Sequence, residues 1–553
     1  MARHRFPRFS QAYGDRFRRQ GLWKDKTLHD AFDEKVEAAP DRIVLIDRDR
    51  RYSMAEFKEA SRALGAGLLS GGIGKGDIVG VQLPNWVEFC FLQIALSRIG
   101  AVIQPLHMVF GERELHNLLS FNETDAVVVC REFRGRNYEE QMKAAGEGLE
   151  FLRTVIVVER DGTTGSQGMS FDQVMDDGRK KLALLDEVKT DPDDVFYLNF
   201  TSGTTGNPKG FLHSHNTLIS RMVMMAEMTA GDTTRRVSLA CSPMTHSYGH
   251  FSTYSAALGG GAMVLVDRYS PTEILEFIER ERVTTLSGTP AHIIGIIDHP
   301  DFSRIDTSSI KSVGVGGARS APELIERLER IWGVKTGNTY GMGENLVHTV
   351  SRPDDPEEKI RESVGRPVPG VELKIVDAND RSKTLESGQI GEICFRGPTL
   401  FVGYHNLPEK TAETRDDDGW FFTGDLGYVD PDGYLYFAGR AQEVINRGGS
   451  KIFPKEVEDL LGGHPGIAAA AVVGMPDERL GERVCAFIVP READVTLEEV
   501  AEYLREQKVM SYLIPEALVN VPELPMTPTG KIRKASLQDD AKRLAASSSN
   551  TGA

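Results

Sequence analysis

Hydrophobic and polar positions in the first third of the chain form two alternating kinds of segment. Apolar runs of strand length occupy residues 77–83, 101–105, 126–130 and 154–158. Between them, residues 57–69 and 86–99 carry apolar positions at helical spacing, and Ser53 with Glu56 forms a capping box before the first of these helices. Strands that alternate with helices predict a parallel sheet with helices packed on its faces.

The middle and the end of the chain show two further patterns of apolar and polar residues. Strands are expected at 262–266, 283–287 and 310–314, with a helix at 271–280. After about residue 365, segments 371–376 and 392–395 alternate between apolar and polar residues, and 434–438 follows the turn pair Asp432–Gly433. This pattern predicts an antiparallel, barrel-like β subdomain. Residues 442–534 read as a short mixture of strands and helices.

These patterns together predict a multidomain α/β fold. The expected large N-terminal domain, residues 1–440, combines layered αβ subdomains with the barrel-like β subdomain. A small α+β C-terminal domain is expected at 441–540. Residues 541–553 are rich in serine and alanine and are expected to form a disordered tail.

Composition agrees with a globular enzyme-sized chain and excludes several classes. The 553 residues are 40% hydrophobic and 26% charged, which suits roughly three to four domain-sized units and excludes a mainly disordered or collagen-like chain. The formal net charge of −16 disfavours nucleic acid as a partner, because such a field repels a phosphate backbone.

Cysteine usage and hydropathy point to a cytoplasmic protein. The five cysteines show no CxxC spacing, which predicts buried reduced thiols rather than a zinc site or a redox dithiol. The best apolar run, 254–266, is short and interrupted by glycines, whereas a spanning helix needs about 20 apolar residues. We therefore expect no membrane span, and a homodimer is one assembly that is compatible with such a chain.

The strongest single feature is the segment 197–210. An apolar strand, 195–200, runs into ten residues dominated by glycine, hydroxyl residues, proline and Lys209. Glycines allow the backbone to fold closely around an anion, and a lysine adds positive charge, so this loop suits a polyphosphate. It is not a Walker A loop, because Pro208 precedes Lys209 and Gly210 follows it.

This loop and four later motifs, in the same order, resemble the adenylate-forming superfamily. The other motifs are 338–344, 423–440, 445–456 and 525–531. The superfamily includes acyl- and aryl-CoA ligases, nonribosomal adenylation domains and beetle luciferases. The chain is most similar to its acyl- and aryl-CoA ligase branch, and to cyclohexanecarboxylate-type CoA ligases in particular.

The resemblance implies a nucleotide site with Mg²⁺ and two further catalytic groups. Glu344 and Thr201 would hold Mg²⁺, Lys531 would neutralise charge at the α-phosphate, and His246 would stand beside the reacting carboxylate. The implied ATP and CoA contacts are Thr201, Ser202, Gly203, Thr204, Thr205, Gly206, Lys209, Gly316, Gly317, Ala318, Asn338, Tyr340, Gly341, Met342, Asp425, Arg440, Gly448 and Gly449.

The implied reaction has two halves. A carboxylic acid and ATP give an acyl-adenylate and pyrophosphate, and then a thiol, coenzyme A, takes the acyl group and releases AMP. In the family the small C-terminal domain is mobile and turns between the halves, bringing Lys531 to the first half and the loop at Gly448 and Gly449 to the second. This chain departs from the family by having Gln442, a neutral residue, at the hinge position.

The acid itself is less sharply defined by the sequence. Segments 21–23, 110–115 and 354–359 look like those of ligases for alicyclic and aryl acids, and a medium-chain acid is also compatible. Ser247 stands where relatives that activate a catechol acid carry asparagine, which argues against that acid. The alternatives are a stand-alone adenylation enzyme that loads a carrier protein, a luciferase-like enzyme and a non-catalytic nucleotide-binding member.

Overall fold

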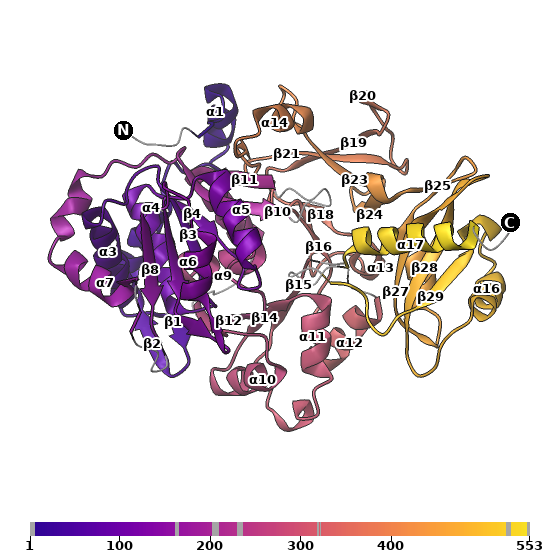
Figure 1. The fold of residues 1–553 in the computed structure, drawn as a ribbon, viewed down its shortest axis with the longest axis horizontal. Coiled ribbons are helices and arrows are strands. Elements are labelled where there is room, and N and C mark those ends of the chain that lie inside the picture. The colour runs from indigo at the N-terminus through magenta and orange to yellow at the C-terminus, as the bar shows by residue number, and fades with distance from the viewer. Residues whose placement is uncertain are drawn as a thin grey trace. The chain divides into compact units, whose positions relative to one another are not determined.

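The structure is a computed structural model and is shown in Figure 1. It describes residues 6–160, 165–166, 168–201, 209–228, 236–317, 320, 322–526 and 532–549. The chain divides into two compact units. Unit 1 comprises Met1–Glu372 with Arg396–Phe421, and unit 2 comprises Leu373–Phe395 with Phe422–Ala553.

An eight-stranded sheet lies at the centre of unit 1. Its strand order is β22-β11-β10-β4-β3-β5-β8-β9. The six strands from β10 to β9 pair in parallel, and β11 pairs antiparallel with both β10 and β22. The bounds are β3 (Ile78–Gln82), β4 (Val102–Pro105), β5 (Ala126–Cys130), β8 (Thr154–Val158), β9 (Met169–Ser170), β10 (Val195–Thr201), β11 (Lys209–Ser214) and β22 (Gly403–Tyr404).

Alternation along the strands directs side chains to helices on both faces of this sheet (Figure 1). Val128 and Ile156 join the core formed with α3 (Met54–Ser70), α4 (Val87–Ile99) and α7 (Phe171–Arg179). Their neighbours Val127 and Val157 join a second core with α5 (Glu112–Asn122) and α6 (Tyr138–Ala145). The parallel strands are therefore buried on both faces, as the continuous apolar runs predict.

A six-stranded sheet forms the second layer of unit 1, in the order β15-β14-β12-β13-β1-β2. All of its neighbouring strands are parallel except β1 and β2. Its bounds are β1 (Ile43–Asp47), β2 (Arg50–Ser53), β12 (Val237–Ala240), β13 (Ala262–Leu265), β14 (Thr285–Gly288) and β15 (Ser312–Val315). The helices α10 (Pro271–Arg280), α11 (Pro290–Ile297) and α12 (Pro322–Trp332) share its apolar core.

Two helices follow the predicted phosphate loop in unit 1. These are α8 (His215–Met228) and α9 (Ser247–Gly259), which contact each other. Phe251 and Tyr254 of α9 are buried in the core that also holds α4. The remaining elements of this unit are α1 (Gln11–Arg19), α2 (Leu28–Ala38), β6 (Glu132–Phe133), β7 (Arg136–Asn137), β16 (Thr339–Tyr340), β17 (Thr349–Val350), α13 (Glu357–Glu362), β18 (Arg366–Pro367) and α14 (Pro408–Thr414).

Unit 2 contains two five-stranded sheets. The first has the order β20-β19-β21-β23-β24, with β19 (Glu372–Asp377), β20 (Asp380–Thr384), β21 (Gly391–Arg396), β23 (Phe421–Val429) and β24 (Leu435–Arg440). The second has the order β26-β25-β28-β27, and β29 also pairs with β28. Its elements are β25 (Ile445–Arg447), β26 (Ser450–Ile452), α15 (Pro454–Gly462), β27 (Ile467–Asp477), β28 (Gly481–Pro490), α16 (Leu497–Glu506), β29 (Ala517–Asn520) and α17 (Lys534–Ser549).

The predicted fold class is confirmed: the chain is a multidomain α/β protein with layered sheets and a smaller C-terminal α+β part. Segments 126–130, 154–158 and 271–280 match their predicted elements at both ends. The compact grouping joins the first sheet of unit 2 to the C-terminal residues, so a domain boundary at residue 440 stays a prediction.

The expectation of a disordered tail from residue 541 is wrong for residues 541–549, because α17 continues through them to Ser549. Two features explain the helix. Leu537 and Ala541 are buried in an apolar cluster with strands β27 and β28, and alanine has the highest helix propensity of all residues.

The cysteine prediction is confirmed. Cys90, Cys130, Cys241, Cys394 and Cys485 are all buried free thiols. Burial raises the pKa of Cys90 and of Cys241 to about 12, so these thiols stay protonated at neutral pH. Within the described part of the chain, no helix has the length and apolar character needed to cross a membrane.

Candidate active site

The predicted phosphate loop connects two paired strands of the central sheet. Thr201 at the end of β10 is in register with Lys209 at the start of β11, and Phe200 is in register with Gly210. The antiparallel ladder therefore fixes both ends of the loop, which makes it a hairpin connection rather than a free linker. Ser202, Gly203, Thr204, Thr205 and Gly206 lie outside the described residues, as does the side chain of Thr201.

Glu344 is buried next to the same strand pair. Glu344 is 7% exposed, and its Oε1 accepts a hydrogen bond of 2.8 Å from the Tyr404 hydroxyl. Tyr404 lies on β22 in register with Phe211 of β11. Burial and the negative charge of Glu344 raise the pKa of Tyr404, so the phenol remains a hydrogen-bond donor. The carboxylate is thus held by a residue that pairs with β11, the strand that begins at Lys209.

His213 joins the second motif to the strand that leaves the phosphate loop. Its Nε2 donates a hydrogen bond of 2.7 Å to the Gly343 carbonyl, directly before Glu344. Burial lowers the pKa of His213 to about 4, so the ring is neutral at pH 7. A Cβ on Gly343 would lie 2.4 Å from the Phe211 ring, so only glycine allows this close approach. The motif is therefore docked on β11 at two points.

Asn338 has internal partners in the structure. Its side-chain oxygen accepts a hydrogen bond of 2.8 Å from the Ser320 backbone N–H, and its amide nitrogen donates to the Ser363 carbonyl at 3.4 Å. The residue is 2% exposed. Asn338 therefore braces the loop that carries the second motif, and its expected contact with adenine stays a prediction.

Tyr340 is half-buried and its ring lies 5.1 Å from the His348 ring, centroid to centroid, at an angle of 33°. Burial lowers the pKa of His348 well below its ordinary value, so the ring that Tyr340 contacts is neutral at pH 7. A Cβ on Gly341 would lie 2.3 Å from the Leu346 carbonyl oxygen. Gly341 thus permits the tight turn that presents Tyr340, and Met342 packs against the main core.

The glycines after β15 face an aromatic residue of α9. The Tyr248 hydroxyl donates a hydrogen bond of 3.4 Å to the Gly314 carbonyl, and a Cβ on Gly316 would lie 3.3 Å from the Tyr248 ring. Gly317 has φ of +85°, a backbone conformation that favours glycine. The strand end therefore forms a surface of small residues beside Tyr248, and Ala318 lies outside the described residues.

His246 caps the N-terminus of α9. Its Nδ1 accepts a hydrogen bond of 3.2 Å from the Tyr248 backbone N–H. The His107 ring lies nearly parallel to it at 6.4 Å, and His107 Nδ1 is 3.0 Å from the Thr245 hydroxyl. Burial lowers the pKa of His107 to about 4. This ring, which follows β4, completes a polar corner that sequence reasoning missed.

A second polar chain links the central sheet to the start of α9. Asn199 Nδ2 donates a hydrogen bond of 2.6 Å to the Tyr197 hydroxyl, which is 3.1 Å from the Ser247 hydroxyl. Asn199 also donates to the Thr245 carbonyl at 3.3 Å. The structure thus brings His246, Lys209 and Glu344 onto elements of one unit.

Unit 2 carries another pair of predicted nucleotide contacts. Asp425 on β23 is in register with Arg440 on β24, and Arg440 Nε lies 3.5 Å from Asp425 Oδ1. Asp425 is 5% exposed, whereas half of the Arg440 side chain is exposed. The strand pair therefore places a carboxylate and a guanidinium side by side, and Gln442 follows in a short 3₁₀ turn, Ala441–Glu443.

Gly448 and Gly449 form the tip of a two-residue hairpin. Arg447 of β25 pairs with Ser450 of β26, and the two glycines between them have φ of +53° and +89°. Positive φ at both central positions is typical of a type I′ turn, for which glycine and asparagine are suited. The hairpin supplies a structural reason for both glycines, and their expected place beside a CoA tunnel stays a prediction.

Lys531 lies outside the described residues, but the ends of its loop are defined. Met526 and Ile532 form an antiparallel bridge, and the Arg533 backbone N–H donates to the Pro525 carbonyl at 2.7 Å. Lys534, at the start of α17, forms ion pairs with Glu443 at 3.1 Å and Glu458 at 2.7 Å. The loop that carries Lys531 therefore begins and ends at fixed points of unit 2.

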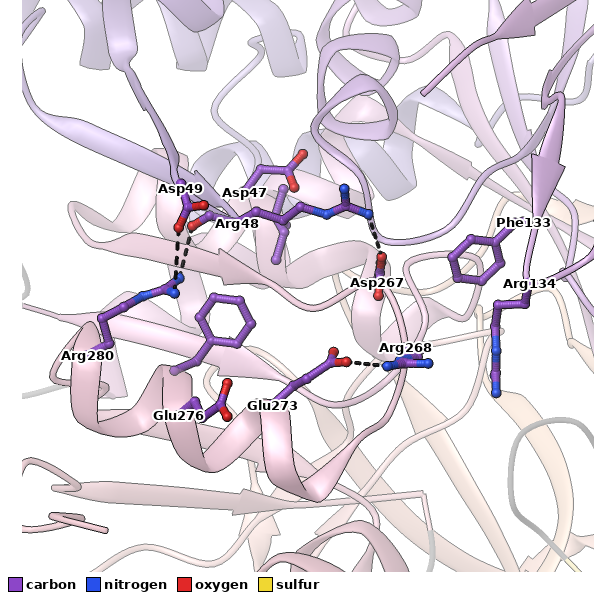
Figure 2. A pocket seen from close by; sticks show the side chains of 12 residues that line it. Asp47, Arg48, Asp49, Phe133, Arg134, Asp267, Arg268, Glu273, Glu276 and Arg280 are labelled. Carbon is purple, nitrogen blue, oxygen red and sulfur yellow. Dashed lines mark hydrogen bonds and ion pairs between the residues drawn. The ribbon is translucent and has the colours of Figure 1, made fainter. Parts of the chain in front are cut away.

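A separate surface pocket of about 450 Å³ lies between β1, β13 and α10 in unit 1 (Figure 2). Three of its four arginines pair with carboxylates of the same pocket. Arg48 pairs with Asp267 at 3.2 Å, Arg280 with Asp49 at 3.7 Å, and Arg268 with Glu273. None of the predicted site residues lines this pocket.

The described residues contain no cluster of three or more His, Cys, Asp or Glu side chains suited to holding a metal ion. Glu344 offers a buried carboxylate bonded to Tyr404 of β22, the strand that pairs with β11. This donor set fits Mg²⁺, which is commonly bound through one or two carboxylates together with substrate phosphates.

Two parts of the chain match known protein families. Residues 32–405 match the family described as AMP-binding enzyme, and residues 456–531 match the AMP-binding enzyme C-terminal domain. The motifs 197–210 and 338–344 lie inside the first range, and 525–531 lies inside the second.

Individual relatives are similar along almost the whole chain. The medium-chain fatty-acid–CoA ligase of Escherichia coli (strain K12) is 33% identical over 532 residues, covering 95% of this chain and 92% of that protein. Salicylyl-CoA synthase / salicylate adenylyltransferase of a Streptomyces species is 32% identical over 552 residues, covering 98% of both. Among solved structures, ATP-bound MatB from Rhodopseudomonas palustris superposes with a TM-score of 0.84 at 26% identity, covering 94% of this chain and 100% of that one.

Proposed function

Because the chain belongs to the AMP-binding enzyme family, we propose that it is an ATP-dependent carboxylate–CoA ligase that releases AMP and pyrophosphate. The proposed substrate is an alicyclic, aryl or medium-chain organic acid. Both an aliphatic and an aromatic acid ligase stand among its relatives at similar identity, which supports this range of acids.

The nucleotide is proposed to bind through residues of both units. In unit 1, the hairpin loop ending at Lys209 would take the phosphates, and the loop around Tyr340 would take the adenine. In unit 2, Asp425 would accept hydrogen bonds from the ribose hydroxyls, and Arg440 would add positive charge. Mg²⁺ held by Glu344, with the Thr201 hydroxyl, would offset negative charge on the phosphates.

In the first half-reaction, a carboxylate oxygen of the acid attacks the α-phosphorus of ATP. The bond to the pyrophosphate oxygen breaks, and pyrophosphate leaves with both bonding electrons. Lys209 and Lys531 would stabilise the negative charge that develops on the phosphoryl oxygens. His246, held at the N-terminus of α9, would orient the acid for in-line attack.

In the second half-reaction, the sulfur of CoA attacks the carbonyl carbon of the acyl-adenylate. The carbon–oxygen bond to AMP breaks, AMP leaves, and the thiol proton passes to solvent. The hairpin tip at Gly448 and Gly449 would line the path of the pantetheine arm, where small residues leave room. A dry path would protect the adenylate from hydrolysis.

The observation that carries the proposal is the placement of Glu344 beside the strand that leaves the phosphate loop. Tyr404 on β22 and His213 on β11 hold the motif that contains Glu344 against the same strand pair that carries Lys209. A buried carboxylate next to a cation-bearing glycine-rich loop is the combination that a Mg²⁺–nucleotide complex requires.

The test is acid-dependent exchange of labelled pyrophosphate into ATP, followed by AMP release with and without CoA. The panel contains fatty, cyclohexane-type, benzoate-type and steroid-side-chain acids. We expect exchange without CoA and AMP release at least about 10-fold faster with it for the preferred acid. AMP release that requires a holo-carrier protein instead of CoA would overturn the choice of thiol.

The two half-reactions are separated by a Lys531→Ala variant. This change should abolish exchange while leaving thioester formation from a supplied acyl-adenylate within a few-fold of the unaltered enzyme. An equal loss of both steps would contradict the division of roles. Absence of exchange with every acid would instead favour a non-catalytic nucleotide-binding protein, and light emission with oxygen would favour a luciferase-like enzyme.

A further inference from the structure

Arg221 on α8 is a half-buried charged side chain without an ion-pair partner among the described residues. Its Nη1 is inaccessible to solvent and has no hydrogen-bond acceptor there. Burial lowers the pKa of Arg221 to about 10, so the guanidinium still carries its charge at neutral pH. Enclosing a charged nitrogen without an acceptor is costly, so this Nη1 calls for a functional reason.

Two other largely buried arginines of unit 1 form ion pairs, whereas Arg415 donates hydrogen bonds to the Phe401 and Val402 backbone carbonyls. Arg98 forms two hydrogen bonds to the Asp33 carboxylate, at 2.8 and 3.0 Å. Arg160 pairs with the carboxylates of Asp47 and Glu88. Arg221 differs from these arginines, because its enclosed Nη1 has no acceptor among the described residues.

The surroundings of Arg221 belong to α9, the helix that His246 caps. The guanidinium carbon lies 5.0 Å from the centroid of the Phe251 ring. Its positive charge also acts on Tyr248, lowering the pKa of that phenol against the larger raising effect of burial. Tyr248 in turn touches Gly314 and Gly316, the small residues at the end of β15. Arg221 thus lies beside α9, the helix whose N-cap residue His246 is proposed to orient the acid.

The geometry of α9 gives the spacing between His246 and Phe251 along the helix axis. His246 precedes α9, and Phe251 follows it by five residues. With a rise of ~1.5 Å per residue, Phe251 lies about 7 Å further along the helix axis than His246. An acid whose reacting carboxylate lies at His246 would therefore need a body of at least about six atoms to reach Arg221.

We propose that Arg221 binds a second oxygen anion, a carboxylate or phenolate, at the far end of the acid substrate. This inference rests on the proposed function, because it assigns the substrate class of the same site. Acids of matching length are six-carbon dicarboxylates and benzoates that carry an oxygen anion in the para position. The aromatic walls formed by Phe251 and Tyr248 suit the flat body of the second kind.

The experiment compares matched acids in pyrophosphate exchange. The pairs are hexanoate with adipate, and benzoate with terephthalate and with 4-hydroxybenzoate. The variants are Arg221→Met, which removes the charge, and Arg221→Lys, which keeps it without the planar fork. Arg304→Met is the matched control, because it removes a guanidinium that is 80% exposed.

We expect kcat/KM for the acid with the distal anion to exceed that of its plain partner by 10- to 100-fold in the unaltered enzyme. Arg221→Met should remove this preference while leaving the plain acids within about 3-fold, and Arg221→Lys should keep part of it. Comparison of terephthalate with 4-hydroxybenzoate separates a carboxylate from a phenolate. An unchanged preference in Arg221→Met, or equal loss on all acids, would overturn the proposal.

Thermal unfolding gives a second readout that does not depend on turnover. Removing an uncompensated buried charge should raise the Tm of the free Arg221→Met variant by about 2–4 °C, and adipate or terephthalate should stabilise the unaltered enzyme alone. A lowered Tm would mean that Arg221 serves the fold, and equal stabilisation of both proteins by these acids would overturn the binding role. Failure of exchange with every acid would count against the proposed function and leave this binding comparison to decide the role of Arg221.

Discussion

The Tyr404 hydroxyl donates a hydrogen bond of 2.8 Å to Oε1 of Glu344, although the two residues lie 60 positions apart. Tyr404 comes from a two-residue strand at the edge of the central sheet, and Glu344 comes from the loop after β16. The contact positions a buried carboxylate beside the strand that leaves the predicted phosphate loop.

Tyr404→Phe should weaken metal-dependent turnover without unfolding the protein. Loss of one hydrogen bond to a charged group amounts to about 1.5–3 kcal/mol, which corresponds to roughly a 10- to 100-fold decrease in kcat/KM for exchange. The measurement is a Mg²⁺ titration of exchange, in which the half-saturating concentration should rise. Tyr13→Phe, which loses a hydroxyl bonded to the Gly397 carbonyl, is the control and should leave the Mg²⁺ dependence unchanged.

His213→Gln should reduce the acid sensitivity of folding. Because burial lowers the pKa of His213 to about 4 from an ordinary 6.5, the unfolded chain takes up a proton first. Its contribution is complete above pH 6.5 and is lost as the pH falls towards 4, amounting to at most ~3 kcal/mol. Tm measured from pH 7 to pH 4 should fall less steeply in the variant than in His116→Gln, which alters an exposed histidine. Parallel curves would contradict the buried neutral state.

Gly341→Ala should raise KM for ATP by about 10-fold or more through displacement of the loop that presents Tyr340. The added Cβ would lie 2.3 Å from the Leu346 carbonyl oxygen, a backbone atom that cannot move by itself. Gly259→Ala is the control, since a Cβ there meets nothing within 4 Å. Steady-state kinetics with ATP as the varied substrate provides the measurement, and an unchanged KM would argue against an adenine-binding role for this loop.

Gly448→Asn separates the structural role of the hairpin tip from its proposed role in CoA binding. Asparagine is well suited to the first central position of a type I′ turn, so the Tm should change by less than about 2 °C. A side chain there should still slow thioester formation from a supplied acyl-adenylate by about 10-fold. Unchanged thioester formation would show that the turn alone explains the glycine.

Much of the fold could be predicted from hydrophobic spacing. The buried strands 126–130 and 154–158 are continuous apolar runs, and their short length together with intervening helical patterns indicates a parallel sheet. The expectation of a disordered tail is wrong for residues 541–549, because composition does not reveal that Leu537 and Ala541 meet an apolar surface of unit 2. Burial at one end of a segment can impose a helix that its polar residues alone do not predict.

The sequence by itself determined the order of the motifs, the candidate positions Lys209, Glu344 and His246, and the alternation that builds the sheets. The alternation and the lysine-bearing loop follow from residue type and spacing along the chain, and the positions of Glu344 and His246 follow from the resemblance of their motifs to a family. Only the tertiary structure decided that Tyr404 and His213 hold the motif of Glu344, and that the Nη1 of Arg221 is enclosed without an acceptor among the described residues. Partners that are distant in sequence meet through packing of separate elements, and whether a charge is paired depends on that packing rather than on its neighbours along the chain.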